Sequence, residues 1–254
     1  MSYNVGVFDT PQLWTSQRWQ RTIEYSKPLI ESLFVKITNP PTSDPNKPAC
    51  MRVENLVFER WFIPVFESVS FQLGAGETLL VRGANGSGKT TLLRLLAGIL
   101  EPTEGKIFLP EQPLAWLGHK LGIKDALSVR ENLEFSARFH NLQPTDALIN
   151  DAIKQLDLLR VADQDAGSLS AGQKKRCALG TLLFQPDAIW LLDEPYSNLD
   201  KSGMQIVDRL LTQHQQRNGI TVLATHGALA PAQLKVRELI VESYQDNYYA
   251  ESLA

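Results

Sequence analysis

After residue 50, short apolar runs alternate with segments in which apolar residues recur at helical spacing. Such runs are typical of strands buried on both faces of a sheet, and such spacing is typical of amphipathic helices. The predicted strands span residues 78–82, 188–192 and 220–224. The predicted helices span residues 90–97, 146–160, 171–184 and 200–217. The alternation predicts an α/β fold with a mainly parallel sheet.

Two of these helices have an apolar face that we expect to pack in the core. In the helix at 146–160 the face consists of Leu148, Ile149, Ala152, Ile153 and Leu156. In the helix at 200–217 it consists of Met204, Val207, Leu210 and Leu211. Glycine marks the end of two helices, with Gly98 after the first and Gly219 after the last.

The first 50 residues have a different character. Residues 39–48 contain four prolines and almost nothing apolar, so they predict an extended linker. The segment before them is too short to build a core of its own. No motif requires these residues, and Met51 follows them directly. We therefore expect residues 1–50 to be an extension, either disordered or read from an incorrectly assigned start codon, and residues 51–254 to form the functional domain.

Composition narrows the class of protein. With 43% hydrophobic and 21% charged residues, the chain of 254 residues is typical of a globular protein. Its net charge of −3 gives no overall basic footprint, so we predict no nucleic-acid partner. No uncharged apolar run reaches the length of about 18 residues that would indicate a membrane-spanning helix. The two cysteines have no metal-ligand spacing.

A phosphate-binding loop follows the first predicted strand. Residues 83–90 fit the pattern G-x-x-x-x-G-K-[ST] at every fixed position. The predicted nucleotide-binding residues are Gly83, Ala84, Asn85, Gly86, Ser87, Gly88, Lys89, Thr90 and Thr91. Loop amides and the helix N-terminus would surround the phosphates, Lys89 would reach the β- and γ-phosphates, and Thr90 would bind Mg²⁺. ATP and Mg²⁺ are the cofactors that we expect.

Four further segments resemble the defining motifs of the ATP-binding-cassette (ABC) ATPases. Leu169, Ser170, Ala171, Gly172 and Gln173 resemble the LSGGQ signature. Residues 188–195 resemble the Walker B strand with Asp193 and Glu194, and residues 197–200 match the D-loop that ends at Asp200. His226 matches the switch histidine. The resemblance covers Met51 to about His226, in the order and spacing of the family.

The resemblance implies a P-loop NTPase fold with a RecA-like core, an antiparallel β subdomain and a small helical subdomain at about 118–182. Asp193 would bind Mg²⁺ together with Thr90, and Glu194 would orient or deprotonate the attacking water. Lys89 and His226 would complete the catalytic set. In the family, the signature faces the ATP of a second copy in a head-to-tail dimer. Ser170 is a good helix N-cap, which suits it to a phosphate.

One position differs from the family pattern, and at a second position the residue that fills the family's role is not certain from the sequence. His119 stands where the family has a coupling glutamine, and we predict that it takes the coupling role. A neutral imidazole can still ligate a metal or accept a hydrogen bond from water. Upstream of the loop, Trp61 is the candidate for adenine stacking. The alternative is that Phe62 and Phe66 are core residues and that Trp61 is incidental.

Residues 117–124 (Leu-Gly-His-Lys-Leu-Gly-Ile-Lys) are more diagnostic than the general motifs. With Leu127-Ser128 and Glu131-Asn132-Leu133, they are similar to the haem-exporter ATP-binding subunits of cytochrome c maturation, the CcmA family. This resemblance implies integral membrane subunits on separate chains, a place at the cytoplasmic face of the inner membrane, and haem handled by the partners.

Three alternatives stay open at the level of sequence. The chain could power export of another substrate, act as a soluble cassette ATPase on ribosomes or DNA, or bind nucleotide without turnover. Glu194 argues against the last of these.

Overall fold

The structure is a computed structural model that describes residues 50–225 and 234–244. All of them belong to residues 39–254, one of the two units into which the chain divides. The predicted N-terminal extension with its linker at 39–48, and the predicted switch residue His226, lie outside the described residues. The predicted boundary near residue 50 therefore stays a prediction.

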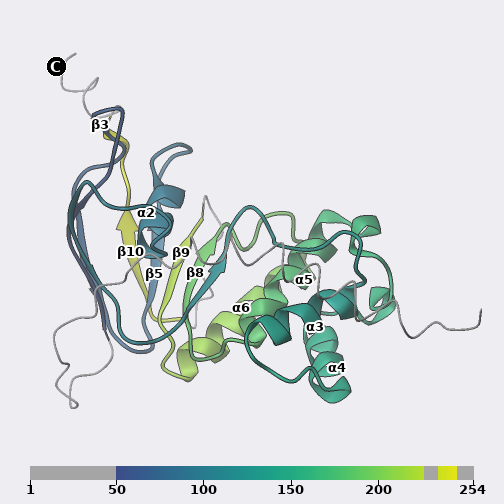
Figure 1. Cartoon of the computed structure of the whole chain (residues 1–254). Coiled ribbons are helices and arrows are strands. Elements are labelled where there is room, and N and C mark those ends of the chain that lie inside the picture. Colours follow the sequence, from purple (N-terminus) through teal and green to yellow (C-terminus); the bar gives the residue numbers. More distant parts are fainter. Residues whose placement is uncertain (1–49, 226–233, 245–254) are drawn as a thin grey trace, which may run out of the picture. The chain divides into compact units, whose positions relative to one another are not determined.

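A five-stranded parallel sheet forms the centre of the described unit (Figure 1). Its strand order is β10-β5-β9-β8-β7, and all four pairings are parallel. The strands are β5 (Thr78–Arg82), β7 (Leu114–Leu117), β8 (Ile189–Asp193), β9 (Thr221–Ala224) and β10 (Val236–Ile240). This confirms the α/β prediction. Strand β8 begins and ends one residue later than predicted, so Asp193 is its last residue.

Side chains of this sheet alternate between two separate cores, which is why its strands are apolar throughout. In β5, Leu79 and Val81 join one core and Leu80 joins the other. The same alternation holds in β8 and β9. The first core includes the antiparallel sheet and one helix, and the second includes the remaining helices.

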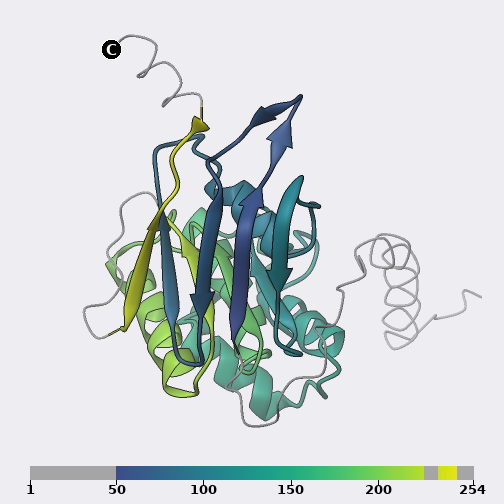
Figure 2. The ribbon, with the colours of Figure 1, turned by 90° about the vertical axis from the view of Figure 1, so that its left-hand side faces the viewer.

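The antiparallel sheet has the strand order β4-β1-β6. Its strands are β1 (Met51–Val57), β4 (Val69–Leu73) and β6 (Glu104–Phe108). A short hairpin of β2 (Glu59–Arg60) and β3 (Ile63–Pro64) connects β1 to β4. Helix α2 (Lys89–Leu96) contributes Leu92, Leu93, Leu95 and Leu96 to the same core as this sheet. In Figure 2 the antiparallel sheet faces the viewer and the larger helices lie behind it.

The remaining helices cover the other face of the parallel sheet (Figure 1). They are α3 (Val129–Phe139), α4 (Asp146–Gln155), α5 (Ala171–Leu183) and α6 (Lys201–Gln216), with short 3₁₀ turns at Leu159–Val161 and Ala166–Ser168. None of the helices in the described ranges is long and apolar enough to cross a membrane.

Two details of the predicted helices were wrong. The helix at 146–160 ends at Gln155, because Asp157 adopts a left-handed φ of 53° that stops it. Ile149, Ala152, Ile153 and Leu156 are nevertheless buried as expected. On α6, Met204 is 40% exposed, and Ile206 packs in the core instead.

Candidate nucleotide-binding site

The loop at residues 83–88 connects β5 to α2 and leaves no room for side chains at two of its glycines. A Cβ atom at Gly83 would collide with the carbonyl oxygen of Val241 and the hydroxyl of Ser87. At Gly88, which has a φ of 101°, it would lie 2.7 Å from Cδ1 of Phe66. Glycine is therefore required by close approach at both positions and by backbone conformation at Gly88. The loop is held close to the N-terminus of α2.

The N-terminus of α2 has the features of an anion-binding site. Its N-cap is Gly88, which offers no side-chain hydrogen bond, and its first turn contains no acidic residue. The Ser87 hydroxyl is buried, and it makes no hydrogen bond with the described part of the chain. Free N–H groups, the positive end of the helix dipole and an unused hydroxyl together fit a phosphate chain.

Lys89 is folded back onto the loop. Its ammonium donates hydrogen bonds to the carbonyl oxygens of Gly83 at 2.9 Å and Ala84 at 2.7 Å. Burial lowers the pKa of Lys89, and the carboxylates of Glu194 and Asp193 oppose that shift. The ammonium thus lies within the loop, in a position to exchange carbonyl oxygens for phosphate oxygens.

The predicted Mg²⁺ ligands Thr90 and Asp193 meet in the structure. The hydroxyl of Thr90 donates to Oδ2 of Asp193 at 2.9 Å, although the two residues belong to different elements. Asp193 is 2% exposed and ends β8. One carboxylate and one hydroxyl beside a phosphate site suit Mg²⁺, which keeps several waters and takes few protein ligands.

Glu194 follows directly and has an unusual backbone. Its φ is 50°, a left-handed backbone conformation that residues other than glycine rarely adopt. The conformation is held by its own N–H, which donates to the carbonyl of Ala224 at 2.9 Å, and by the Ser197 hydroxyl, which donates to the Glu194 carbonyl at 2.8 Å. Strained residues held in this way are common at active sites.

The signature segment begins α5 with a capping box. The Ser170 hydroxyl accepts from the N–H of Gln173 at 3.2 Å, and Oε1 of Gln173 accepts from the N–H of Ser170 at 2.9 Å. Ser170 is therefore the N-cap, as predicted. Leu169 is buried and Ala171 is exposed. The helix thus presents its N-terminus with an exposed hydroxyl residue beside it.

The D-loop packs against this signature within the same chain. A Cβ atom at Gly172 would lie 2.8 Å from the carbonyl oxygen of Asn198, so the two backbones are in close contact. Asn198 is left-handed, with a φ of 62°. Asp200 caps α6 by accepting from the N–H of Gly203 at 2.8 Å. That hydrogen bond, followed by one from Ser202, lowers the pKa of Asp200.

His119 is exposed and lies just beyond the end of β7. Strand β7 pairs in parallel with β8, whose last residue is Asp193. Because the carboxyl ends of parallel strands meet at one edge of a sheet, His119 and the carboxylates share that edge. The residues after His119 are fixed by Asn132, whose side chain hydrogen bonds to both N–H and carbonyl of Lys124.

The structure separates the aromatic candidates upstream of the loop. Trp61 and Phe62 form the turn of the β2–β3 hairpin and are 86% and 94% exposed. Phe66 is fully buried against Gly88. The alternative interpretation was thus right for Phe66 and wrong for Phe62. Stacking of Trp61 on adenine stays a prediction.

Lys175 is a residue of the site that sequence reasoning missed. It is 3% exposed on α5, and burial lowers its pKa while Asp193 and Glu194 oppose the shift. Its spacing carried a signal, because Lys175 precedes the buried residues Ala178, Leu179 and Leu182 at helical intervals of three, four and seven. Two buried lysines, Lys89 and Lys175, therefore interact electrostatically with the two carboxylates.

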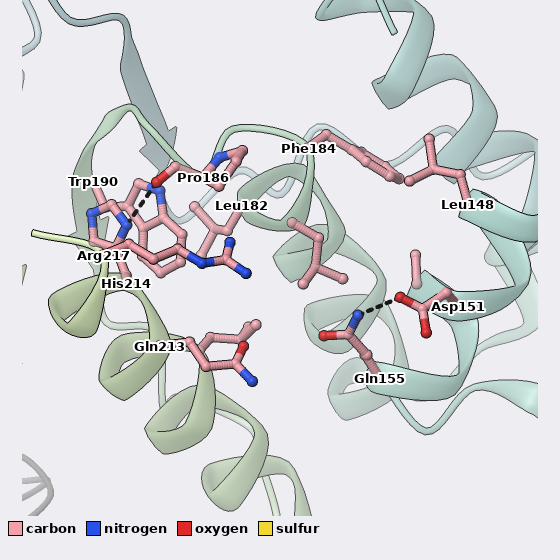
Figure 3. A pocket seen from close by; sticks show the side chains of 13 residues that line it. Leu148, Asp151, Gln155, Leu182, Phe184, Pro186, Trp190, Gln213, His214 and Arg217 are labelled. Atoms are coloured by element: carbon pink, nitrogen blue, oxygen red, sulfur yellow. Dashed lines mark hydrogen bonds between the residues drawn. The ribbon is translucent and has the colours of Figure 1, made fainter. Parts of the chain in front are cut away.

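Two hollows lie in the helical half of the unit. A groove of about 410 Å³ is lined by β7, the segment 120–123, α3 and α5, and includes the half-exposed ring of Phe139. A smaller pocket of about 130 Å³ lies near the amino end of β8, where His214 and Trp190 stack at 3.8 Å (Figure 3). The smaller pocket belongs to the opposite end of β8 from Asp193 and Glu194.

Comparison with known proteins agrees with this geometry. The family model described as ABC transporter matches residues 66–197. The cytochrome c biogenesis ATP-binding export protein CcmA of Xanthomonas campestris pv. campestris (strain 8004) is 39% identical over 205 residues, covering 77% of this chain and 95% of that protein. The CcmA protein of Pseudomonas putida (strain GB-1) is 40% identical over 200 residues, covering 74% and 95%.

Solved structures show the same fold. An ABC transporter ATP-binding protein from Pyrococcus furiosus superposes with a TM-score of 0.68 at 23% identity, covering 77% of this chain and all of that one. An inward-facing metal-chelate type ABC transporter superposes with a TM-score of 0.64 at 29% identity, covering 78% and 81%.

Proposed function

This chain belongs to the ABC transporter family and, within it, to the cytochrome c biogenesis ATP-binding export proteins CcmA, and we propose that it powers haem export, or release of haem from its periplasmic chaperone, during cytochrome c maturation. As an ATP-binding subunit of this family, it couples ATP hydrolysis to transport. The observation that carries the haem proposal is the identity of 39% across 95% of the Xanthomonas relative.

ATP binding would use the anion-ready end of α2. The loop amides and the Ser87 hydroxyl would take the phosphates, and the Lys89 ammonium would leave the carbonyls of Gly83 and Ala84 for phosphate oxygens. Since burial already lowers the pKa of Lys89, a polyanion at this position would favour its charged form. Trp61 is the residue that we propose for the adenine ring.

Hydrolysis would use the two carboxylates at the end of β8. Mg²⁺, when bound, would neutralise charge that develops on the phosphates. Thr90 and Asp193 would hold it, because their oxygens already lie 2.9 Å apart beside the loop. Glu194 would accept a proton from the attacking water or orient it, at the position that its left-handed backbone gives it. We assign His226 the role of contacting the γ-phosphate.

A second copy of the chain would complete each site. The residues Leu169 to Gln173 would face the ATP of that copy, where the exposed Ser170 and the N-terminus of α5 could bind its γ-phosphate. In such a head-to-tail dimer the D-loop, which packs on Gly172 of its own chain, would lie at the interface as well.

Integral membrane subunits on separate chains would dock at the cytoplasmic face of the inner membrane, and they would handle the haem. We propose His119 as the coupling residue, since it shares the sheet edge of Asp193 and lies next to the groove between β7 and α5. Replacing His119 by Ala should leave ATP hydrolysis running while transport falls. Wild-type coupling of the two rates in that variant would rule the role out.

Deletion of the gene tests the assignment to cytochrome c maturation. The deletion strain should lack holocytochromes c, while the apocytochromes are still made and exported. Normal holocytochrome c in that strain would contradict the haem assignment and would favour an exporter of another substrate.

A further inference from the structure

Tyr196 lies in the turn between the catalytic carboxylates and α6. Its ring is 5% exposed, and its hydroxyl donates a hydrogen bond to Oδ1 of Asp208 at 2.8 Å. Asp208 belongs to the body of α6, twelve residues further along the chain. A hydroxyl bonded to a carboxylate is among the stronger neutral-to-charged contacts in proteins. The bond therefore ties the turn firmly to the helix that follows it.

Three further hydrogen bonds of this turn are local. The N–H and hydroxyl of Ser197 both donate to the carbonyl of Glu194, at 3.1 and 2.8 Å, and the N–H of Leu199 donates to the carbonyl of Tyr196 at 3.3 Å. These contacts close the turn upon itself and set its internal shape. None of these three bonds reaches the body of α6, whereas the Tyr196–Asp208 bond does.

Two parts of the turn carry groups that must be placed accurately. At its start Glu194 has a strained left-handed backbone. In its middle Asn198 packs against Gly172 of the signature helix. Burial raises the pKa of Tyr196, as does its bond to Asp208, so the phenol remains a donor throughout the pH range in which the protein works. A displacement of about 1 Å at a catalytic group can reduce turnover severely.

We propose that the Tyr196 hydroxyl, through Asp208, positions the turn that carries Glu194 and the D-loop, and that Tyr196 is thereby a positioning residue for ATP hydrolysis. The proposal rests on the hydrolytic role of Glu194. That role is tested separately with Glu194→Gln, so failure of one does not imply failure of the other.

The test compares variants of the full chain in complex with its membrane subunits. Tyr196→Phe removes one hydroxyl and keeps the ring. Loss of one hydrogen bond to a charged group should lower kcat by about 3- to 10-fold with the KM for ATP unchanged. Asp208→Ala should cause the same loss, and the double variant should lose no more than either single variant. Asp208→Asn, which keeps an acceptor oxygen, should restore part of kcat relative to Asp208→Ala.

Thr212→Val is the matched control. Its hydroxyl donates to the backbone carbonyl of Asp208 at 2.8 Å, on the same helix but away from the turn. This variant should keep the wild-type kcat. The proposal is overturned if Tyr196→Phe has wild-type kcat, if losses in the double variant add, or if Thr212→Val lowers kcat as much as Tyr196→Phe does at an equal loss of thermal stability.

Discussion

The two ends of strand β8 use buried polar groups in different ways. At its carboxyl end Asp193 and Glu194 are buried, with the ammonium groups of Lys89 and Lys175 buried around them. Glu194 is held there in a strained conformation. Burying a charged group lowers the stability of the fold, and it also keeps water from screening that charge. Active sites are the places where proteins tolerate this loss of stability.

At the amino end the polar group is a neutral base that serves folding. The ring of His214 is 2% exposed and stacks on Trp190 with an interplanar angle of 4°. Its Nδ1 lies 3.2 Å from the carbonyl oxygen of Pro186 (Figure 3). Its Nε2 lies 3.3 Å from the carbonyl oxygen of Ile220. The ring thus connects α6, the residue before β9 and the loop before β8. Strand β8 thus joins the candidate catalytic site at its carboxyl end to a region at its amino end where the buried polar group contributes to packing.

The largest expected effect is on activity at the carboxyl end. Glu194→Gln keeps the size of the side chain and removes the proposed base, so kcat for ATP hydrolysis should fall on the order of 10²- to 10⁴-fold. The thermal unfolding temperature should not fall, because a buried charge is removed. Steady-state ATPase assays and calorimetry would measure both. Asp151→Asn, the same chemical change on the exposed side of α4, should alter neither quantity.

The next effect is on stability at the amino end, and it depends on pH. Burial lowers the pKa of His214 to about 4, although its two carbonyl neighbours oppose the shift. An unfolded histidine titrates near pH 6.5, so below that pH the unfolded chain binds a proton that the folded chain does not. The free energy of unfolding should therefore decrease between about pH 6.5 and 4, by up to about 3 kcal/mol.

Denaturant titrations across this range would measure that slope. His214→Gln should flatten it. His140, whose pKa is also lowered by burial, should account for part of what remains. An unchanged slope in His214→Gln would show that this ring does not resist protonation in the folded state.

A smaller effect, also on stability at the amino end of β8, is expected at Gly219. A Cβ atom there would overlap the ring of His214, so Gly219→Ala should destabilise the fold by about 1–3 kcal/mol through overpacking. The kcat of the folded fraction should stay at the wild-type value, since the site lies at the other end of β8. Chemical denaturation and active-site titration would separate the two. A loss of kcat at full folding would break the division between the two ends.

The division also explains what the sequence could predict. The strand–loop–helix arrangement of the phosphate loop and the helix N-cap at Ser170 depend on residues that are close in sequence, so their patterns predicted them correctly. The resemblance to the ABC ATPases implied that Thr90 and Asp193 would lie together at one Mg²⁺ site, and their oxygens are 2.9 Å apart.

Features that depend on the fold as a whole were not predictable in the same way. The hydrogen bond between Tyr196 and Asp208 depends on how the turn folds back onto α6, and the sequence around neither residue indicates that path. Phe62 is exposed because a two-residue turn of the β2–β3 hairpin places it at the tip, with a φ of 64°. The helix after residue 146 ends early because Asp157 turns left-handed, although its apolar spacing continues.

The most direct test of the central claim is complementation of the gene deletion, scored by the haem content of c-type cytochromes. The full chain should restore holocytochrome c, and Glu194→Gln, present at the same level and bound to the membrane subunits, should not. Restoration of normal holocytochrome c by Glu194→Gln would contradict the claim that ATP hydrolysis at this site powers the process.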